Sequence, residues 1–298
     1  MKKNNLLEAA LLGSSSALGL NWIYDKELLL KEAKKDSMIF RPIDHELYKK
    51  AKNGFDVYPT HQLGQLDFMG EVLYLFHMFY DYEKEDSLLR WTEYFYEYFK
   101  KGNGYNGYLE KYGTDFLTQY KIALDSSKKP NTTTDHNDKQ LIGLTFLLHL
   151  YEQERSTEKV NDALLFARTL TNYTAITPLN IMLFELLKKL DYGIKKEDAL
   201  KDVIKLAPQM YQNSLRAAIT IPEAYEFISD YAGVACDLTQ SLPLIFYIVK
   251  NSDSWIKGME LNATLGGASS ARGLFVSALL SRIYEIPQEY KDKLYYKV

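Results

Sequence analysis

The sequence predicts an all-α fold, a single compact multi-helix domain spanning residues 1–298. Three observations favour this class. Nearly every segment repeats its apolar residues at the helical period of about 3.6. β-Branched or aromatic bursts outside the helical patterns are confined to residues 57–58 and 174–177, and both are short. No linker rich in Pro, Gly or Ser divides the chain, and no internal repeat indicates a solenoid.

The first part of the chain predicts two helices followed by a long loop. A first helix has its apolar face at positions 6, 9, 10, 12 and 13. Asp25 is the expected N-cap of a second helix over residues 26–35. Residues 37–66 show no helical period and contain Pro42, Gly54, Pro59 and Gly64, so we expect a loop. Structureless loops of this length are uncommon and often functional.

Helical patterns then continue to the end of the printed sequence. Apolar stripes occupy residues 69–79 and 91–99, and a Gly- and Asn-rich turn at 101–107 precedes a helix over 112–124. A polar connection at 126–138 leads to a helix that begins near residue 141. Further helices are expected at nine segments: 158–171, 178–191, 196–206, 209–218, 222–229, 238–250, 253–263, 269–284 and 287–294.

Two local patterns mark helix ends among these segments. Thr220 and Glu223 form a capping-box pattern around Pro222, which suits the first turn of a helix. Gly193 stands where a helix C-cap is expected.

Composition limits the classes of function. Hydrophobic residues make up 46% of the chain, which is enough for a sizeable core. The 36 basic and 39 acidic residues are interspersed and give a net charge of −3. That balance disfavours nucleic-acid binding, which needs a basic surface. The single cysteine, Cys236, excludes an internal disulfide and a multi-cysteine zinc cluster.

Membrane insertion is not expected, because the longest apolar run, residues 242–249, is too short to cross a bilayer. Met1-Lys2-Lys3 and the apolar residues up to position 12 have the outline of a signal peptide. Glu8 interrupts that apolar region, and no disulfide framework follows it. We therefore expect a cytoplasmic protein.

Small residues at positions 13–17 and a carboxylate pair are the first candidates for a site. The small residues suit either tight helix packing or the floor of a site at a helix end. Asp67 and Glu71 are four residues apart, so they share a helix face, where they could bind Mg²⁺ or divide acid and base roles. A solvated helix face explains the same spacing without function.

A polar segment at residues 131–140 is the next candidate. It concentrates hydroxyl, amide and carboxylate groups in front of an apolar helix. Capping of that helix by Thr134 or Asp135 accounts for part of this density, and a ligand-facing loop accounts for the rest. His136 is a candidate acid or base, although lone loop histidines are usually solvated.

The most informative segment, residues 262–273, places Gly266 and Gly267 before a long apolar helix. A glycine pair lets the backbone approach a ligand closely. The helix start offers N–H groups that suit a phosphate or a sugar diol. Arg272, one turn into the helix, could pair with a phosphate or with a carboxylate from another helix.

In this order, the segments resemble the ADP-ribosylglycohydrolase superfamily. Residues 16–19 (Ser-Ala-Leu-Gly) resemble the family's Gly-Asp-Ala-Leu-Gly, and residues 65–69 lie where it has Gln-x-Thr-Asp-Asp-Thr. Residues 266–271 (Gly-Gly-Ala-Ser-Ser-Ala) resemble its Gly-Gly-Asp-Thr-Asp-Thr, and residues 285–287 resemble its Gly-Ile-Pro ending. The resemblance runs from about residue 5 to 295. Three variant motifs look closer to a divergent branch that includes jellyfish crystallins and a related selenoprotein: residues 22–25, 70–71 and 270–273.

The resemblance implies hydrolysis of a glycosidic bond, with small-molecule or protein-linked ADP-ribose as the partner. In the family, motif carboxylates hold two Mg²⁺ ions that position the distal ribose and the attacking water. Asp67 is retained here, and Ser269 matches a threonine ligand, so these two are the expected metal ligands. The remaining aspartate positions are occupied by Ser16, Ala268 and Ser270.

Catalytic roles are expected for Asp67, Glu71 and Asp135. The expected substrate-binding residues lie in the Gly-Gly segment and in two loops: Trp22, Asn137, Asp138, Gly266, Gly267, Ser269, Ser270 and Arg272. Three functions remain open. The chain is a metal-poor or metal-free hydrolase that uses carboxylates alone, a pseudoenzyme that binds ADP-ribose or a nucleotide, or a structural or interaction protein.

Overall fold

The computed structural model describes residues 4–83 and 88–298. Across these two ranges the chain forms sixteen α-helices and no β-strand, which confirms the predicted all-α class. Where loops run side by side they form isolated β-bridges, such as those that join Ile23 to Gly54 and to Gly267.

The helices are joined by turns and loops, the longest of which include residues 51–67 and 126–141. The first eight are α1 (Leu6–Ala17), α2 (Lys26–Ala33), α3 (His45–Lys50), α4 (Phe68–Glu83), α5 (Leu88–Phe99), α6 (Lys111–Asp125), α7 (Ile142–Gln153) and α8 (Glu158–Ala167). The next eight are α9 (Ile176–Asp191), α10 (Lys196–Val203), α11 (Gln209–Thr220), α12 (Ala224–Tyr231), α13 (Leu238–Lys250), α14 (Trp255–Leu265), α15 (Ser269–Leu280) and α16 (Gln288–Lys291). Short 3₁₀ turns follow α1 and α10, at Leu18–Leu20 and Ile204–Leu206.

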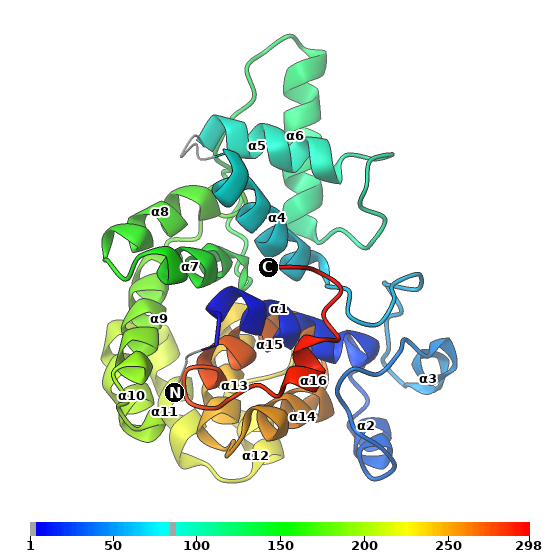
Figure 1. Cartoon of the computed structure of the whole chain (residues 1–298), viewed down its shortest axis with the longest axis vertical. Coiled ribbons are helices and arrows are strands. Elements are labelled where there is room, and N and C mark those ends of the chain that lie inside the picture. Colours follow the sequence, from blue (N-terminus) through cyan, green and yellow to red (C-terminus); the bar gives the residue numbers. More distant parts are fainter. Residues whose placement is uncertain (1–3, 84–87) are drawn as a thin grey trace.

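Helices α1 and α15 form the centre of the molecule. Figure 1 shows α7 to α11 along one flank, α12 to α14 below, and α5 and α6 projecting at the top. One hydrophobic core includes buried residues from Leu6 in α1 to Ile286 after α15. Helix α15 is buried at every residue and α1 at every residue except Glu8, as expected for helices surrounded by others.

A pair of glycines lets the two central helices touch backbone to backbone. A Cβ atom on Gly13 would lie 2.1 Å from the carbonyl oxygen of Gly273. A Cβ on Gly273 would lie 2.4 Å from the carbonyl oxygen of Gly13. No side chain fits at either position without moving a helix. The small residues at 13–17 therefore include a packing contact, as one of their two interpretations predicted.

The loop predicted over residues 37–66 is wrong in part, because His45–Lys50 forms α3. Asp44 caps this helix by accepting hydrogen bonds from the N–H groups of Glu46 and Leu47, at 2.9 and 3.2 Å. A helix of 6 residues is too short to show a helical period, so only the cap could have indicated it.

Two predicted helix caps are wrong, although α7 begins within one residue of its predicted start near 141. Thr220 is the last residue of α11, and its hydroxyl donates to the carbonyl of Arg216 at 3.0 Å instead of capping the next helix. Helix α12 begins after Glu223, whose side chain forms no capping bond. Helix α7 begins at Ile142 and has no side-chain cap, so Thr134 and Asp135 lie too far upstream. Polar density in front of a helix is thus a weak guide to its first residue.

Other predicted ends are confirmed. Asp25 caps α2 by accepting from the N–H of Leu28 at 3.1 Å, and Gly193 follows α9 with a φ of +75°. None of the described helices is long and apolar enough to cross a bilayer. Met1-Lys2-Lys3, the basic start of the signal-peptide pattern, lies outside the described residues.

Candidate functional site

Backbone hydrogen bonds join five chain segments that are far apart in the sequence. Trp22 is central, because its N–H donates to Gly267 O at 2.7 Å and its carbonyl accepts from Phe55 N at 3.1 Å. The N–H of Ala268 donates to Val234 O, and that of Leu238 donates to Lys139 O. We call this the loop belt; it comprises residues 22–24, 53–55, 139–140, 234–238 and 266–268.

The Gly-Gly pair serves the belt itself. Gly266 and Gly267 have φ values of +75° and +68°, which favour glycine. A Cβ on Gly267 would lie 1.9 Å from Val234 O, and one on Gly266 would lie 2.5 Å from Ile23 O. The close approach that the sequence indicated is therefore made by the protein's own backbone.

The start of α15 is bonded within the protein as well. The N–H groups of Ala268, Ser269 and Ser270 donate to Val234 O, Gly267 O and Asn21 Oδ1, at 2.8, 2.8 and 3.1 Å. The expected free N–H groups are thus engaged in the described structure. A phosphate at this helix start would have to displace these bonds.

Arg272 donates several hydrogen bonds to the same segment. Its guanidinium is fully buried and donates to Asn262 Oδ1 at 2.8 Å, to Asn262 O at 3.0 Å and to Gly266 O at 2.7 Å. These bonds satisfy carbonyls at the end of α14. In the structure Arg272 fixes the turn between α14 and α15.

Asp67 lies directly before α4 and is buried. Its Oδ1 accepts from the hydroxyl of Ser14 and from the N–H of Gly70, both at 2.9 Å. Burial raises the pKa of Asp67 to about 6, and these two hydrogen bonds oppose the rise. Gly70 permits the arrangement, since a Cβ there would lie 2.8 Å from Ser14 Oγ.

Glu71, one turn into α4, is held by two tyrosines. Tyr98 on α5 donates to Glu71 Oε2 at 3.2 Å, and Tyr296 donates to Oε1. Burial raises the pKa of Glu71 to about 7, against the effect of these bonds. Glu71 follows Asp67 by one helical turn, since its N–H donates to the carbonyl of Asp67 at 2.9 Å. The carboxylate of Glu71 is hydrogen-bonded to the two tyrosines.

Glu110 is a buried carboxyl that the sequence interpretation missed. It directly precedes α6 and is 5% exposed. Burial raises the pKa of Glu110 to about 8, and repulsion from Asp67 and Asp138 adds to the rise. Nothing in the local pattern separates it from an exposed helix-start glutamate; its place after the Gly-rich turn at 101–107 was the one available signal.

Asp138 and Asp67 both act electrostatically on Glu110, and we call these three carboxyls the carboxyl cluster. Asp138 is half-buried and accepts from the N–H of Gln140 at 2.9 Å. Burial is the main cause of its raised pKa. The cluster therefore combines two buried carboxyls with one that solvent reaches.

Four aromatic rings contact one another near Glu110, and we call Trp22, Phe55, Tyr58 and Tyr108 the aromatic wall. Burial raises the pKa of two of them, Tyr58 and Tyr108, and repulsion from Glu110 adds to the rise. The ring of Trp22 meets Tyr108 edge to face at 5.1 Å and Phe55 at 6.4 Å. Tyr58 meets Tyr108 at 6.4 Å and accepts a hydrogen bond from the N–H of Phe68 at 2.9 Å. Burial raises the pKa of Tyr58 further above its usual value, with a contribution from nearby Asp67. The wall thus joins the loop belt to the start of α4.

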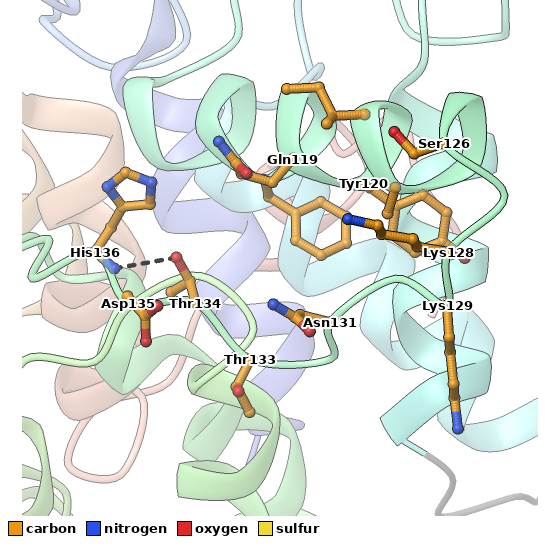
Figure 2. Close-up of a pocket in the computed structure, with 13 residues that line it drawn as sticks. Gln119, Tyr120, Ser126, Lys128, Lys129, Asn131, Thr133, Thr134, Asp135 and His136 are labelled. Carbon is orange, nitrogen blue, oxygen red and sulfur yellow. Dashed lines mark hydrogen bonds between the residues drawn. The ribbon is translucent and has the colours of Figure 1, made fainter.

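The other predicted site residues lie at the buried start of α15 and on the exposed loop before α7. Ser269 and Ser270 are buried; the Oγ of Ser269 has no hydrogen-bond partner among the described residues, and that of Ser270 donates to Ser14 O at 3.0 Å. Asp135 and Asn137 are exposed. Asp135 lines a pocket against α6, shown in Figure 2, whose lining includes no member of the carboxyl cluster.

The residues do not fit a two-Mg²⁺ site of the kind the resemblance implies. Nowhere in the described ranges do three Asp, Glu, His or Cys side chains group as metal ligands. Oδ1 of Asp67 already accepts two hydrogen bonds, and Ser269 offers only a neutral hydroxyl. Hard cations need carboxylate charge.

Comparison with known proteins supports the fold. No family model and no curated protein matches the sequence. A solved structure described as an ADP-ribosylglycohydrolase-related protein complex is similar to this chain with a TM-score of 0.66. The match covers 98% of this chain and 92% of that chain at 15% identity. The chain therefore has the fold of an ADP-ribosylglycohydrolase-related protein, as the order of its motifs predicted.

Proposed function

We propose that this chain is a member of the ADP-ribosylglycohydrolase superfamily that hydrolyses the glycosidic bond of an ADP-ribosylated substrate with its carboxyl cluster. The observation that carries the proposal is the pair of buried carboxyls, Asp67 and Glu110, next to an aromatic wall on a matching fold. Their pKa values, about 6 and about 8, lie on either side of neutrality. Two carboxyls whose pKa values differ in this way can take separate acid and base roles.

Each carboxyl has a role that follows from its surroundings. Glu110 is protonated at neutral pH and donates a proton to the leaving-group atom. Asp67 is ionised above about pH 6 and stabilises the positive charge of an oxocarbenium-like transition state. Asp138, the half-buried member, accepts a proton from the attacking water.

The aromatic wall binds the substrate in this proposal. Trp22 is half-buried and Tyr108 is exposed, so parts of both rings can contact a ligand. Aromatic faces pack against adenine rings and against the apolar faces of sugars. A Trp22→Ala variant should therefore raise KM more than it lowers kcat.

Replacing Glu110 with Gln tests the acid role. The variant keeps size and burial but cannot donate an acidic proton, so we expect kcat on an ADP-ribosylated peptide to fall by about 100-fold or more. Glu285→Gln, at an exposed position, is the matched control and should retain the wild-type rate. Wild-type turnover by the Glu110→Gln variant would overturn the assignment.

A second candidate is a binder of ADP-ribose without turnover. It is favoured by the replacement of motif aspartates with Ser16, Ala268 and Ser270 and by the internally bonded start of α15. The variant motifs also resemble those of a branch with jellyfish crystallins and a related selenoprotein, and the crystallins use this scaffold in a structural role. A binder would raise its melting temperature with ADP-ribose yet release no ADP-ribose from a substrate, with or without Mg²⁺.

A further inference from the structure

The outer pocket lies between α6 and the loop of residues 126–136 (Figure 2). Its volume is about 410 Å³, within the range of roughly 300–1,000 Å³ typical of small-molecule sites. Phe116 and Tyr120 of α6 provide its apolar side. Its polar lining residues are Gln119, Ser126, Lys128, Lys129, Asn131, Thr133, Thr134, Asp135 and His136.

The backbone of the loop is fixed to the core. The N–H of Thr134 donates to Arg168 O at 2.9 Å, and the carbonyl of His136 accepts from Asn172 N at 2.8 Å. Thr169 Oγ1 also donates to the carbonyl of Thr132, at 3.3 Å. These bonds attach the loop to the α8–α9 connection, so a ligand would not have to order its backbone on binding.

The rim side chains remain available on this fixed backbone. Within the parts of the chain that the structure describes, the side chains of Lys128, Asn131 and Thr133 have no hydrogen-bond or ion-pair partner. Figure 2 shows Lys128 extended across the pocket in front of Tyr120, with Asn131 and Thr133 on the facing loop. Lys121, also near the end of α6, is instead paired with Asp125 at 2.8 Å. The pocket therefore presents unused donors and a positive charge beside aromatic rings.

We propose that this pocket binds a nucleoside phosphate, with the base against Phe116 and Tyr120 and the phosphate at Lys128 and Asn131. An ammonium and an amide donor match phosphate oxygens, and aromatic side chains contact nucleobases favourably without reading their sequence. Asp135 supplies an acceptor for a ribose hydroxyl or an exocyclic amine. Asp135 thereby belongs to ligand binding here rather than to the carboxyl cluster. The inference does not depend on the proposed hydrolase activity.

Titration of the ¹⁵N-labelled full chain with ADP tests this site, with adenosine and inorganic phosphate as partial probes. We expect saturable shifts of the amide signals of residues 126–136, with ADP binding more tightly than either partial probe. The Lys128→Gln and Asn131→Ala variants should each bind ADP about tenfold more weakly, the effect of losing one charged or polar contact. Lys121→Gln removes an equal charge outside the pocket and should bind within about twofold of wild type.

Two results would overturn the proposal. One is equal ADP affinity in the Lys128→Gln and Lys121→Gln variants; the other is a titration that leaves the amides of residues 126–136 unshifted. Glu110→Gln should leave ADP binding at this pocket unchanged, because Glu110 does not line it. The two proposals can therefore fail independently of each other.

Discussion

At the residue scale, Asp67 and Glu110 are both buried, but their surroundings favour different protonation states. Asp67 accepts from Ser14 Oγ and from the N–H of Gly70, and these bonds favour its charged form. Glu110 combines burial with repulsion from Asp67 and Asp138, which favours its neutral form. One carboxyl is therefore suited to carry charge and the other to carry a proton.

The pH dependence of hydrolysis should follow from this difference. Activity should rise as Asp67 loses its proton near pH 6 and fall as Glu110 loses its proton near pH 8. The measurement is kcat/KM on an ADP-ribosylated peptide between pH 5 and 9. A rate that keeps rising above pH 8 would exclude Glu110 as the acid.

Ser14→Ala should move the acidic limb of that profile. The variant removes the hydroxyl that donates to Asp67, so the pKa of Asp67 should rise and the limb should shift to higher pH. The alkaline limb, set by Glu110, should stay in place. Ser281→Ala is the control, since its hydroxyl bonds only to its own helix turn at Ala278 O; an equal shift there would show a general loss of structure.

Sequence reasoning found Asp67, Glu71 and Asp138 but not Glu110, and the reason is physical. Asp67 and Glu71 stand in an apolar helical pattern, where a carboxyl is conspicuous because burial is costly. Glu110 follows a polar turn, and its burial arises from packing of the 101–109 loop against the loop belt and α4. Such long-range burial leaves no local signature.

At the element scale, the α1–α15 crossing sets the position of the belt and of Asp67. Gly13 and Gly273 allow this crossing, and Ser14, the next residue, reaches Asp67 from the same turn. Ser270, three residues before Gly273, binds the carbonyl of Ser14. Packing and site geometry are therefore coupled through one helix pair.

Gly13→Ala should destabilise the fold. The added methyl would lie 2.1 Å from the backbone of Gly273, and overpacking of this kind costs about 1–3 kcal/mol or more. Gly104→Ala is the matched control, because a Cβ there meets no atom within 4 Å. Urea unfolding of both variants measures the difference; equal midpoints would contradict the close crossing.

Helix periodicity located most elements to within a few residues, because buried helices carry continuous apolar faces. The misses have particular causes. Helix α3 is shorter than two turns. Thr220 ends α11, and Glu223 precedes α12 without a side-chain capping bond, so the capping-box pattern does not mark the start of α12. The pattern of Gly266 and Gly267 does not tell which partner comes close, since a close approach to backbone and one to a ligand leave the same sequence pattern.

At the scale of the whole molecule, buried carboxyls make stability depend on pH. Glu71 and Glu110 have folded-state pKa values of about 7 and about 8, raised by burial. A raised carboxyl contributes stability below its unfolded pKa and loses it as pH rises through the folded value. His149 opposes this only below its ordinary pKa of 6.5, since burial lowers its folded pKa to about 3.

The free energy of unfolding should therefore fall between pH 6.5 and 8, where the histidine no longer contributes a slope. Glu110→Gln should flatten the decline above pH 7. Urea titrations of both proteins at four pH values in this window measure it. A wild-type stability that is constant or rises across the window would contradict the raised pKa of Glu110.

The overall fold was more accessible to sequence than the chemistry was. The order of four degenerate motifs predicted an architecture that the solved structure shares at 15% identity. The chemistry depends on which carboxyls meet when distant loops close, and Asp67, Glu110 and Asp138 come together from three separate segments. Their arrangement is set by the tertiary structure and not by any local sequence pattern.

The release of ADP-ribose from an ADP-ribosylated peptide, measured in EDTA and in Mg²⁺ for wild type and Glu110→Gln, tests the central claim most directly. The carboxyl cluster predicts release by the wild type that EDTA does not reduce and that the variant loses. Release that requires Mg²⁺, or no release by the wild type in either condition, would contradict hydrolysis by the carboxyl cluster.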